Sequence, residues 1–174
     1  MARDVAVTGV ERFFDDDEII VSKTNLQGHI TYGNNVFLRL AGYDERDMLD
    51  QPHNMIRHPD MPRCIFKLLW DTIEDSKEIF AYVMNRAKNG DHYWVLAHVT
   101  PSFDGSGNVI GYHSSRRVPE RRVLDDTIIP LYKSLLAEES RHEDRKAGLE
   151  ASTGILLNLL REKGVEYDEL VFSL

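Results

Sequence analysis

The fold of this chain is decided by residues 79–102, which have the sequence IFAYVMNRAKNGDHYWVLAHVTPS. Apolar and aromatic side chains are dense over 79–86 and again over 92–102, in the alternating pattern of β-strands. Between the two runs lies Asn89-Gly90, the strongest short-range signal of a hairpin, because both central residues of its turn need a positive φ. The stretch therefore predicts two antiparallel strands joined by a tight turn.

Three further strands are predicted on either side of this hairpin. Residues 104–108 form a second turn rich in glycine and polar residues, and the β-forming residues of 109–118 continue the sheet beyond it. Upstream, two short β-rich runs at 18–25 and 29–32 flank Gly28 and predict a first hairpin. The pattern favours an antiparallel five-stranded sheet that short helices cover on one face, which is an α+β fold.

The short helices are expected between the two hairpins. Apolar residues fall at helical spacing over 36–41, where one of the two preceding asparagines can form the N-cap and Gly42 the C-cap. A second short helix is predicted over 45–49, and a third begins after Pro62.

The last third of the chain is predicted to be helical. Leucine-rich helical spacing extends over 124–142, where Pro130 is expected to start a fresh helix, and again over 149–163. At the other end lies an arm whose aromatic residues Phe13-Phe14 are expected to dock on another surface. The predicted parts are an N-terminal arm (1–17), a sheet domain (18–118) and a helical C-terminal extension (119–174).

The composition narrows the classes of function. The 174 residues carry a net charge of −8, which gives no electrostatic reason to expect nucleic acid or an anionic membrane as a partner. One cysteine, Cys64, leaves no intramolecular disulfide or multi-cysteine metal site, and its apolar surroundings predict a buried, unreactive thiol. No apolar run reaches the roughly 20 residues of a membrane-spanning helix, and the start is not a signal peptide. We therefore expect a cytoplasmic protein without membrane insertion.

Catalytic signatures are missing from the sequence. It has no nucleophile elbow, no phosphate loop and no dinucleotide fingerprint. The seven histidines show no metal-ligand spacing, although a single one can serve as a haem ligand. We therefore expect neither an enzyme nor a metal-ion site.

Residues 51–62, with the sequence QPHNMIRHPDMP, are unusual for a solvent-exposed loop. Three prolines restrict the backbone, and the apolar residues between them require burial. A rigid loop holds polar side chains at low entropic cost, which suits a binding site, and His53, Arg57 and His58 can present donors to a carbonyl-rich or anionic ligand. A rigid connection in which Arg57 and Asp60 merely pair explains the run equally well.

Three segments resemble PAS sensor domains. They are 51–62, the stretch NRAKNGDHYWV at 85–95, and VTP at 99–101 together with GYHS at 111–114. More narrowly, the chain resembles the sensory domains of aerotaxis receptors from residue 18 to about residue 117. The KNGDxYW piece is shared by many PAS domains and indicates fold alone, whereas the proline-rich run is specific to the aerotaxis-receptor group.

The resemblance implies a ligand and the residues that hold it. Domains of this group carry non-covalent FAD between the central helices and the sheet, sense its redox state and signal to a chemotaxis module. The positions that match the family's flavin-binding and pocket residues are Asn34, His53, Arg57, His58, Asp60, Trp70 and Asn85.

The favoured hypothesis is a soluble PAS redox or oxygen-related sensor that binds FAD. It would form a homodimer through its C-terminal helices and signal in trans to a chemotaxis-type partner. Two alternatives remain: a PAS module that binds haem or a small metabolite, and a ligand-free protein-interaction domain.

Overall fold

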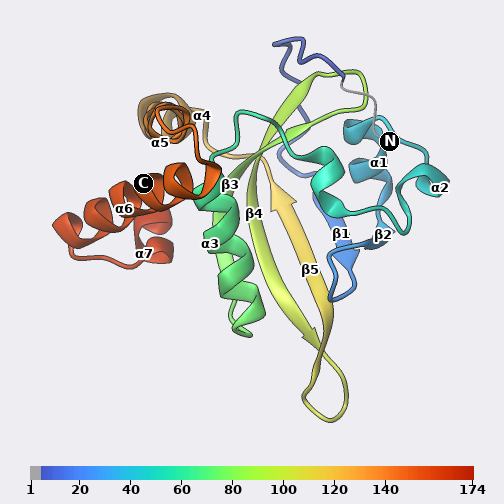
Figure 1. The fold of residues 1–174 in the computed structure, drawn as a ribbon. Helices are drawn as coiled ribbons and strands as arrows, with labels where there is room; N and C mark the ends of the chain where they lie inside the picture. The colour runs from blue at the N-terminus through green and yellow to red at the C-terminus, as the bar shows by residue number, and fades with distance from the viewer. Residues whose placement is uncertain (1–4) are drawn as a thin grey trace. The chain divides into compact units, whose positions relative to one another are not determined.

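The computed structural model describes residues 5–174 (Figure 1). Five strands within this range form an antiparallel sheet in the order β2-β1-β5-β4-β3, which confirms the predicted sheet. The strands are β1 (Ile20–Thr24), β2 (Ile30–Gly33), β3 (Ile79–Arg86), β4 (His92–Phe103) and β5 (Val109–Arg117).

Helices occupy the two regions that the sequence assigns to them. Those between β2 and β3 are α1 (Asn35–Ala41), α2 (Glu45–Met48), the 3-10 helix η1 (His53–Ile56) and α3 (Arg63–Glu74). Those after β5 are α4 (Arg121–Val123), the π-helical turn η2 (Leu124–Ile128), α5 (Ile129–Ser140), α6 (Arg145–Lys163) and α7 (Tyr167–Ser173). No helix in the described part of the chain has both the length and the apolar character needed to cross a membrane.

The described residues form two compact units. The first unit contains the chain up to His58 together with Thr72–Val118, and the second contains Pro59–Asp71 together with Pro119–Leu174. The sequence pattern predicts that 59–71 belong to the sheet domain, whereas the structure groups this segment with the C-terminal helices. The reason is a buried ion pair in the second unit, where Arg63 Nε donates to Glu139 Oε2 at 2.9 Å.

The β3–β4 hairpin forms as predicted, but its turn is wider than a two-residue Asn89-Gly90 turn: Ala87 N–H donates to the Asp91 carbonyl at 2.8 Å, and Asn89 does not have the positive φ expected for it. Ile79 lies opposite Val99, and Arg86 lies opposite His92. Gly90 has a φ of +96°, and a Cβ at this position would lie 2.1 Å from the carbonyl oxygen of Ala6. The turn and the N-terminal arm therefore both require glycine here.

The N-terminal arm is held by its backbone and by Arg12. Thr8 N–H donates to the Gly90 carbonyl at 3.0 Å, and Arg12 N–H donates to the His92 carbonyl at 2.7 Å. The Arg12 side chain pairs with Asp91 at 3.0 Å. Phe13 is 71% exposed, so main-chain pairing rather than this side chain holds the arm, and the docking of Phe13-Phe14 stays a prediction.

Helix α5 follows η2 without a break, at a position set by Pro130. Because proline lacks an N–H, the regular hydrogen bond four residues back cannot form there. The helix widens just before it, and Ile129 N–H donates to the carbonyl of Leu124, five residues back. Pro130 thus begins α5 as predicted, but within a continuous helical rod.

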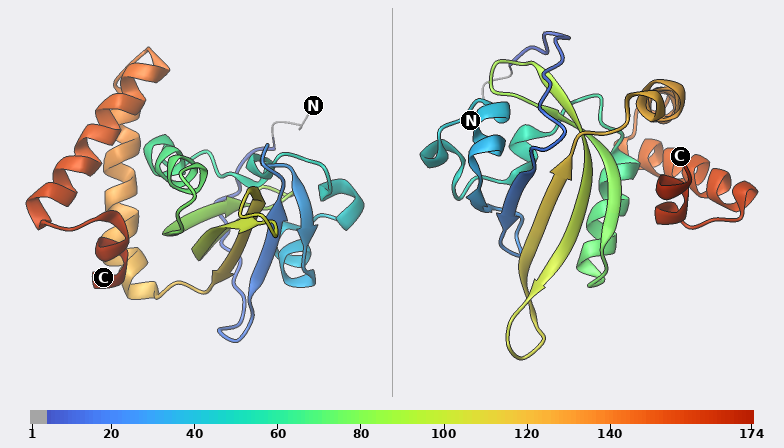
Figure 2. Two further views of the ribbon diagram at one scale, coloured as in Figure 1. Left: turned by 90° about the horizontal axis from the view of Figure 1, so that it is seen from below. Right: turned by 180° about the vertical axis from the view of Figure 1, so that it is seen from behind.

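Helices α5 and α6 lie side by side in the second unit (Figure 2). Leu135 of α5 and Leu156 and Leu160 of α6 are buried, as the leucine spacing predicts. Cys64 is also buried, and burial is the main cause that raises the pKa of its thiol, which agrees with the predicted unreactive cysteine.

Asn34 fixes the start of α1 against β1. Its Oδ1 accepts from the N–H groups of Phe37 at 3.0 Å and Val21 at 3.1 Å, and its Nδ2 donates to the carbonyl of Ile19 at 2.8 Å. Every polar atom of this side chain is therefore engaged by the protein.

We expect Asn34→Ala to lower the free energy of unfolding by about 2 kcal/mol, because it removes both the cap and the link to β1. Urea unfolding followed by circular dichroism measures the change. Asn35→Ala is the control, because Asn35 is exposed and lies inside the first turn. Equal losses for the two variants would contradict this role of Asn34.

Candidate functional site

One face of the sheet carries buried polar side chains. Asn85 lies opposite Tyr93, and Arg116 lies opposite both Ala97 and Ile20. Opposite residues share a face and side chains alternate along a strand, so Asn85, Tyr93 and Arg116 share a face with Ser22. Each of these four residues is at most 4% exposed. This face is therefore polar where a sheet core is ordinarily apolar.

Arg116 places a positive charge at the centre of this face. Its Nη2 donates to Ser22 Oγ, and its guanidinium carbon lies 4.6 Å from the centroid of the Phe37 ring. Burial lowers the pKa of Arg116 to about 10, so the group stays charged at neutral pH. Its Nε and Nη1 have no hydrogen-bond partner among the described residues. A buried charge with unused donors is costly unless a ligand engages them.

A hydrogen-bonded chain extends from Arg116 to His53. Ser22 Oγ accepts from Arg116 and lies 3.1 Å from His53 Nε2, which is the acceptor available to the buried hydroxyl proton. His53 is therefore protonated on Nδ1. Its ring stacks on Phe37 with centroids 6.0 Å apart. Desolvation, aided by the charge of Arg116, lowers the pKa of His53 to about 3, so the imidazole is neutral.

Several other buried donors on the same face of the sheet also lack a hydrogen-bond partner in the described part of the chain. Asn85 Nδ2, Tyr93 Oη and Thr24 Oγ1 have no hydrogen-bond partner among the described residues. Burial raises the pKa of Tyr93 to about 12, although the positive charge of Arg116 opposes the shift, so the phenol remains a donor. Arginine and amide nitrogens only donate. This set of donors fits a flat or anionic ligand that is rich in oxygen and nitrogen acceptors.

The first unit brings some of the predicted site residues together. His53 lies in η1 beside Ser22 and Phe37. The backbone of Arg57 pairs with that of Asn85, which places the proline-rich run beside β3. His58 is 4% exposed and its ring meets His92 edge-on at 5.7 Å.

Three other predicted site residues are in different settings. Asp60 and Trp70 belong to the second unit, and their role stays a prediction. Asn34 uses its polar atoms to hold α1 and β1. Sequence reasoning missed the residues at the centre of the site: Ser22, Thr24, Phe37, Tyr93 and Arg116. One signal in the sequence could have found Arg116. The alternation of side chains along β5 places this arginine on the buried face of the sheet, where a charged residue is unusual.

Comparison with known proteins identifies similar sequences. The model of the PAS fold family matches residues 30–116. The aerotaxis receptor of Escherichia coli strain K12 is 42% identical over 125 residues, which cover 70% of this chain and 24% of the receptor. A nitrogen fixation regulatory protein of Klebsiella pneumoniae is 27% identical over 99 residues, covering 57% of this chain and 20% of that protein. The chain thus matches about a quarter or less of these relatives.

Solved structures of light-oxygen-voltage (LOV) domains share the fold. The light state of the blue-light photoreceptor Aureochrome1 LOV gives a TM-score of 0.58 at 18% identity, covering 64% of this chain and 89% of the other. A LOV domain studied with a flavin analogue gives 0.57 at 18% identity, covering 67% and 87%. These likenesses establish the architecture of the sheet and its helices.

The neutral state of His53 predicts a pH dependence of stability. In the unfolded chain this histidine titrates near 6.5, whereas its pKa in the folded chain is about 3. Between these values the unfolded state binds one more proton, so the free energy of unfolding falls as the pH falls, by up to about 1.4 kcal/mol per unit. We expect His53→Gln to remove this contribution. Urea unfolding at a series of pH values measures it, and slopes equal to those of the wild type would contradict the assignment.

Proposed function

The chain belongs to the PAS family, and from that premise we propose that it binds FAD and acts as a sensor of the flavin's redox state. The observation that carries the proposal is the set of buried, unused donors around Arg116. The pyrimidine edge of a flavin offers carbonyl oxygens and ring nitrogens as acceptors, and this edge matches a face made of donors. The similarity to the aerotaxis receptor and to a LOV domain studied with a flavin analogue supports a flavin as the ligand.

The residues of the site have separable roles in this proposal. Arg116 Nε and Nη1, Asn85 Nδ2 and Tyr93 Oη would donate to the acceptors of the ligand. The Ser22 hydroxyl holds Arg116 and fixes the tautomer of His53. The further residues proposed to support the flavin, by match to the family, are Asn34, Arg57, His58, Asp60 and Trp70.

Sensing requires that the protein bind two states of the ligand differently. A bound flavin supplies a group that gains electrons and protons on reduction. Arg116 holds a positive charge away from water, so it binds an electron-rich form of its ligand more tightly than an electron-poor one. Neutral His53 has an Nδ1 proton to donate. Both groups therefore respond to a change in the charge of the ligand.

The output of the sensor is proposed to pass through the C-terminal helices. The similarity to an aerotaxis receptor supports a chemotaxis-type protein as the partner in trans. We propose in addition that the chain forms a homodimer through these helices. Leu157 of α6 is 43% exposed and Phe172 of α7 is 64% exposed, so both are available for such an interface.

We expect Arg116→Met to empty the site without destabilising the apoprotein. Affinity for FAD should fall at least about tenfold, because charge-assisted hydrogen bonds are lost. The fold should tolerate the change, because a buried cation with unused donors is replaced by an apolar side chain. The visible flavin absorption of the purified protein measures occupancy, and thermal unfolding measures stability.

Arg117→Met is the matched control, because Arg117 is the exposed neighbour on the same strand. It should keep the flavin spectrum of the wild type. Full flavin occupancy in Arg116→Met would contradict the proposed site, and a wild-type protein that takes up no FAD would contradict the proposed function.

A charge on α6 should break the proposed dimer. Leu157→Glu places a carboxylate in an apolar contact, and we expect the dimer dissociation constant to rise at least about tenfold. Light scattering over a concentration series measures it. Leu26→Glu is the control, because Leu26 has a similar exposure of 45% but lies between β1 and β2. If both variants stay dimeric, the interface lies outside α6.

A further inference from the structure

Helix α1 brings one aromatic side chain to the buried polar face of the sheet. The Phe37 ring centroid lies 4.6 Å from the guanidinium carbon of Arg116, and the ring stacks on His53 with centroids 6.0 Å apart. A Cβ at Gly33 would lie 2.7 Å from Phe37 Cδ1, so the ring is confined on that side as well. The place of α1 therefore decides how this ring meets the two polar groups.

A helix as short as α1 depends on support at both ends. It has seven residues, fewer than the roughly 12 that an isolated helix needs to be stable in water. Asn34 holds its first turn to β1. The last four carbonyls of a helix lack partners within it, so the other end is held by groups from outside the helix.

Two donors from other segments bind the carbonyls of the last turn of α1. Arg12 Nη1 donates to the Leu40 carbonyl at 2.8 Å, and Lys88 N–H donates to the Ala41 carbonyl at 2.8 Å. The bond from the guanidinium is charge-assisted and therefore the stronger kind. Lys88 belongs to the β3–β4 turn, whereas Arg12 belongs to the N-terminal arm. The arm thus reaches α1 through the Arg12 side chain.

Asp91 fixes the direction of the Arg12 side chain. Arg12 Nε donates to Asp91 Oδ2 at 3.0 Å, while Thr8 Oγ1 and Asn89 Nδ2 donate to the same carboxylate, each at 2.7 Å. The hydrogen bonds from Thr8, Asn89 and Arg12 lower the pKa of Asp91 to about 2, so the carboxylate is charged at neutral pH. Because the guanidinium is planar and rigid, binding Nε to Asp91 directs Nη1 at the Leu40 carbonyl.

We propose that Arg12 is a positioning residue for the binding site, which joins the N-terminal arm to the last turn of α1 and thereby holds Phe37 against Arg116 and His53. This inference rests on the proposed function, since it gives the arm a part in shaping that site. Every residue in this connection belongs to the first compact unit. Phe37 lies three residues before Leu40, within one helical turn, so a shift of the last turn moves the ring with it.

The test compares Arg12→Met with Thr8→Val in the full chain. Methionine keeps much of the apolar stem of arginine but donates no hydrogen bond, so the contacts with Asp91 and with the Leu40 carbonyl are both lost. Thr8→Val is the matched control, because the Thr8 hydroxyl also lies in the arm and also binds Asp91. The control weakens the hold of the arm on Asp91 and leaves the contact between Arg12 and α1 in place.

Hydrogen–deuterium exchange by mass spectrometry gives the first readout, in protein without added ligand. Arg12→Met should speed exchange in peptides that cover 35–43 at least about tenfold, as the loss of a charge-assisted hydrogen bond implies. Thr8→Val should leave those peptides unchanged, and β4 peptides over 94–100 should be unchanged in both variants. If Arg12→Met leaves 35–43 unchanged, speeds β4 by the same factor, or acts no more strongly than Thr8→Val, the proposal is overturned.

The second readout is the NMR signal of the His53 ring protons, which reports the ring contact itself. The stacked Phe37 ring shifts these signals by its ring current, and Phe37→Leu gives their position without that ring. The signals are assigned by their loss in His53→Gln. Arg12→Met should move them toward their position in Phe37→Leu, and Thr8→Val should leave them in place. Signals at the wild-type position in Arg12→Met would overturn the proposal.

The third readout is the affinity for FAD, which should fall at least about tenfold in Arg12→Met and stay at the wild-type value in Thr8→Val, because a ligand binds best to donors that are already in place. Wild-type affinity in Arg12→Met would overturn the proposal. If the wild type binds no FAD, the proposed function fails, while the first two readouts still decide the role of Arg12. Should Arg12→Met lose its cooperative thermal transition, Arg12→Lys replaces it throughout, because a single ammonium nitrogen cannot occupy the places of both Nε and Nη1.

Discussion

The guanidinium of Arg116 is buried on the sheet with only part of its hydrogen-bonding capacity used, and the rest of the first unit's site is arranged around it. Ser22 accepts from it, Phe37 lies against its face, and His53 takes the hydroxyl proton of Ser22. Burial, aided by this charge, lowers the pKa of His53 and keeps it neutral, and the charge opposes the rise in the pKa of Tyr93. A folded protein tolerates such an arrangement at a cost of a few kcal/mol, and a ligand that accepts the free donors offsets it.

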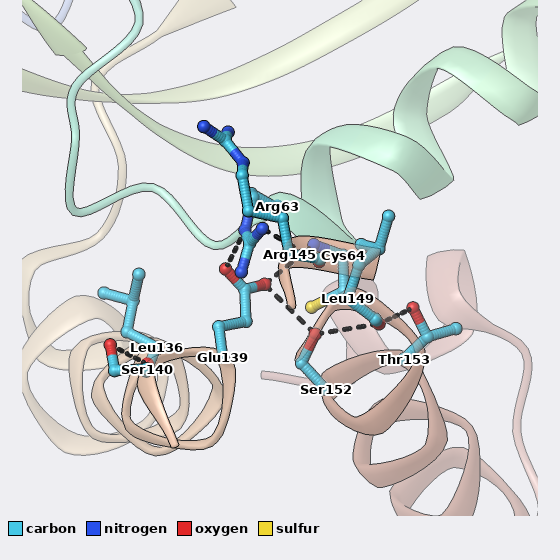
Figure 3. Close-up of polar contacts among 9 residues, drawn as sticks. All are labelled: Arg63, Cys64, Leu136, Glu139, Ser140, Arg145, Leu149, Ser152 and Thr153. Atoms are coloured by element: carbon cyan, nitrogen blue, oxygen red, sulfur yellow. Dashed lines mark hydrogen bonds and ion pairs between the residues drawn. The ribbon is translucent and has the colours of Figure 1, made fainter. Parts of the chain in front are cut away.

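The second unit contains a buried negative charge, the carboxylate of Glu139. Unlike the guanidinium of Arg116, its hydrogen-bonding capacity is used. Glu139 is engaged on both oxygens, by a guanidinium, a backbone N–H and a hydroxyl (Figure 3). An unsatisfied buried charge indicates a place for a ligand, whereas a fully satisfied one holds elements together. The contrast in hydrogen bonding therefore supports the proposed binding role of Arg116 and a structural, connecting role of Glu139.

The parts of the fold that sequence predicts well depend on local chemistry. The β3–β4 hairpin, the Asn34 cap and Pro130 at the start of α5 each require only a few neighbouring residues, and all lie where expected, although the hairpin turn closes between Ala87 and Asp91 and is wider than predicted. The centre of the site was missed because it depends on register: Ser22 and Arg116 share a face only once β1 pairs with β5, across more than 90 residues of sequence. The grouping of 59–71 with the C-terminal helices was missed for the same reason, since Arg63 and Glu139 are 76 residues apart.

The free energy of the Arg63–Glu139 pair shows how firmly it holds the second unit together. Allosteric coupling energies are typically about 1–3 kcal/mol, whereas removing one partner of a buried ion pair costs about 3–5 kcal/mol. A coupling energy of that size is too small to break the Arg63–Glu139 pair. The pair therefore holds α5, α6 and the first turn of α3 together as one packed group within the second unit.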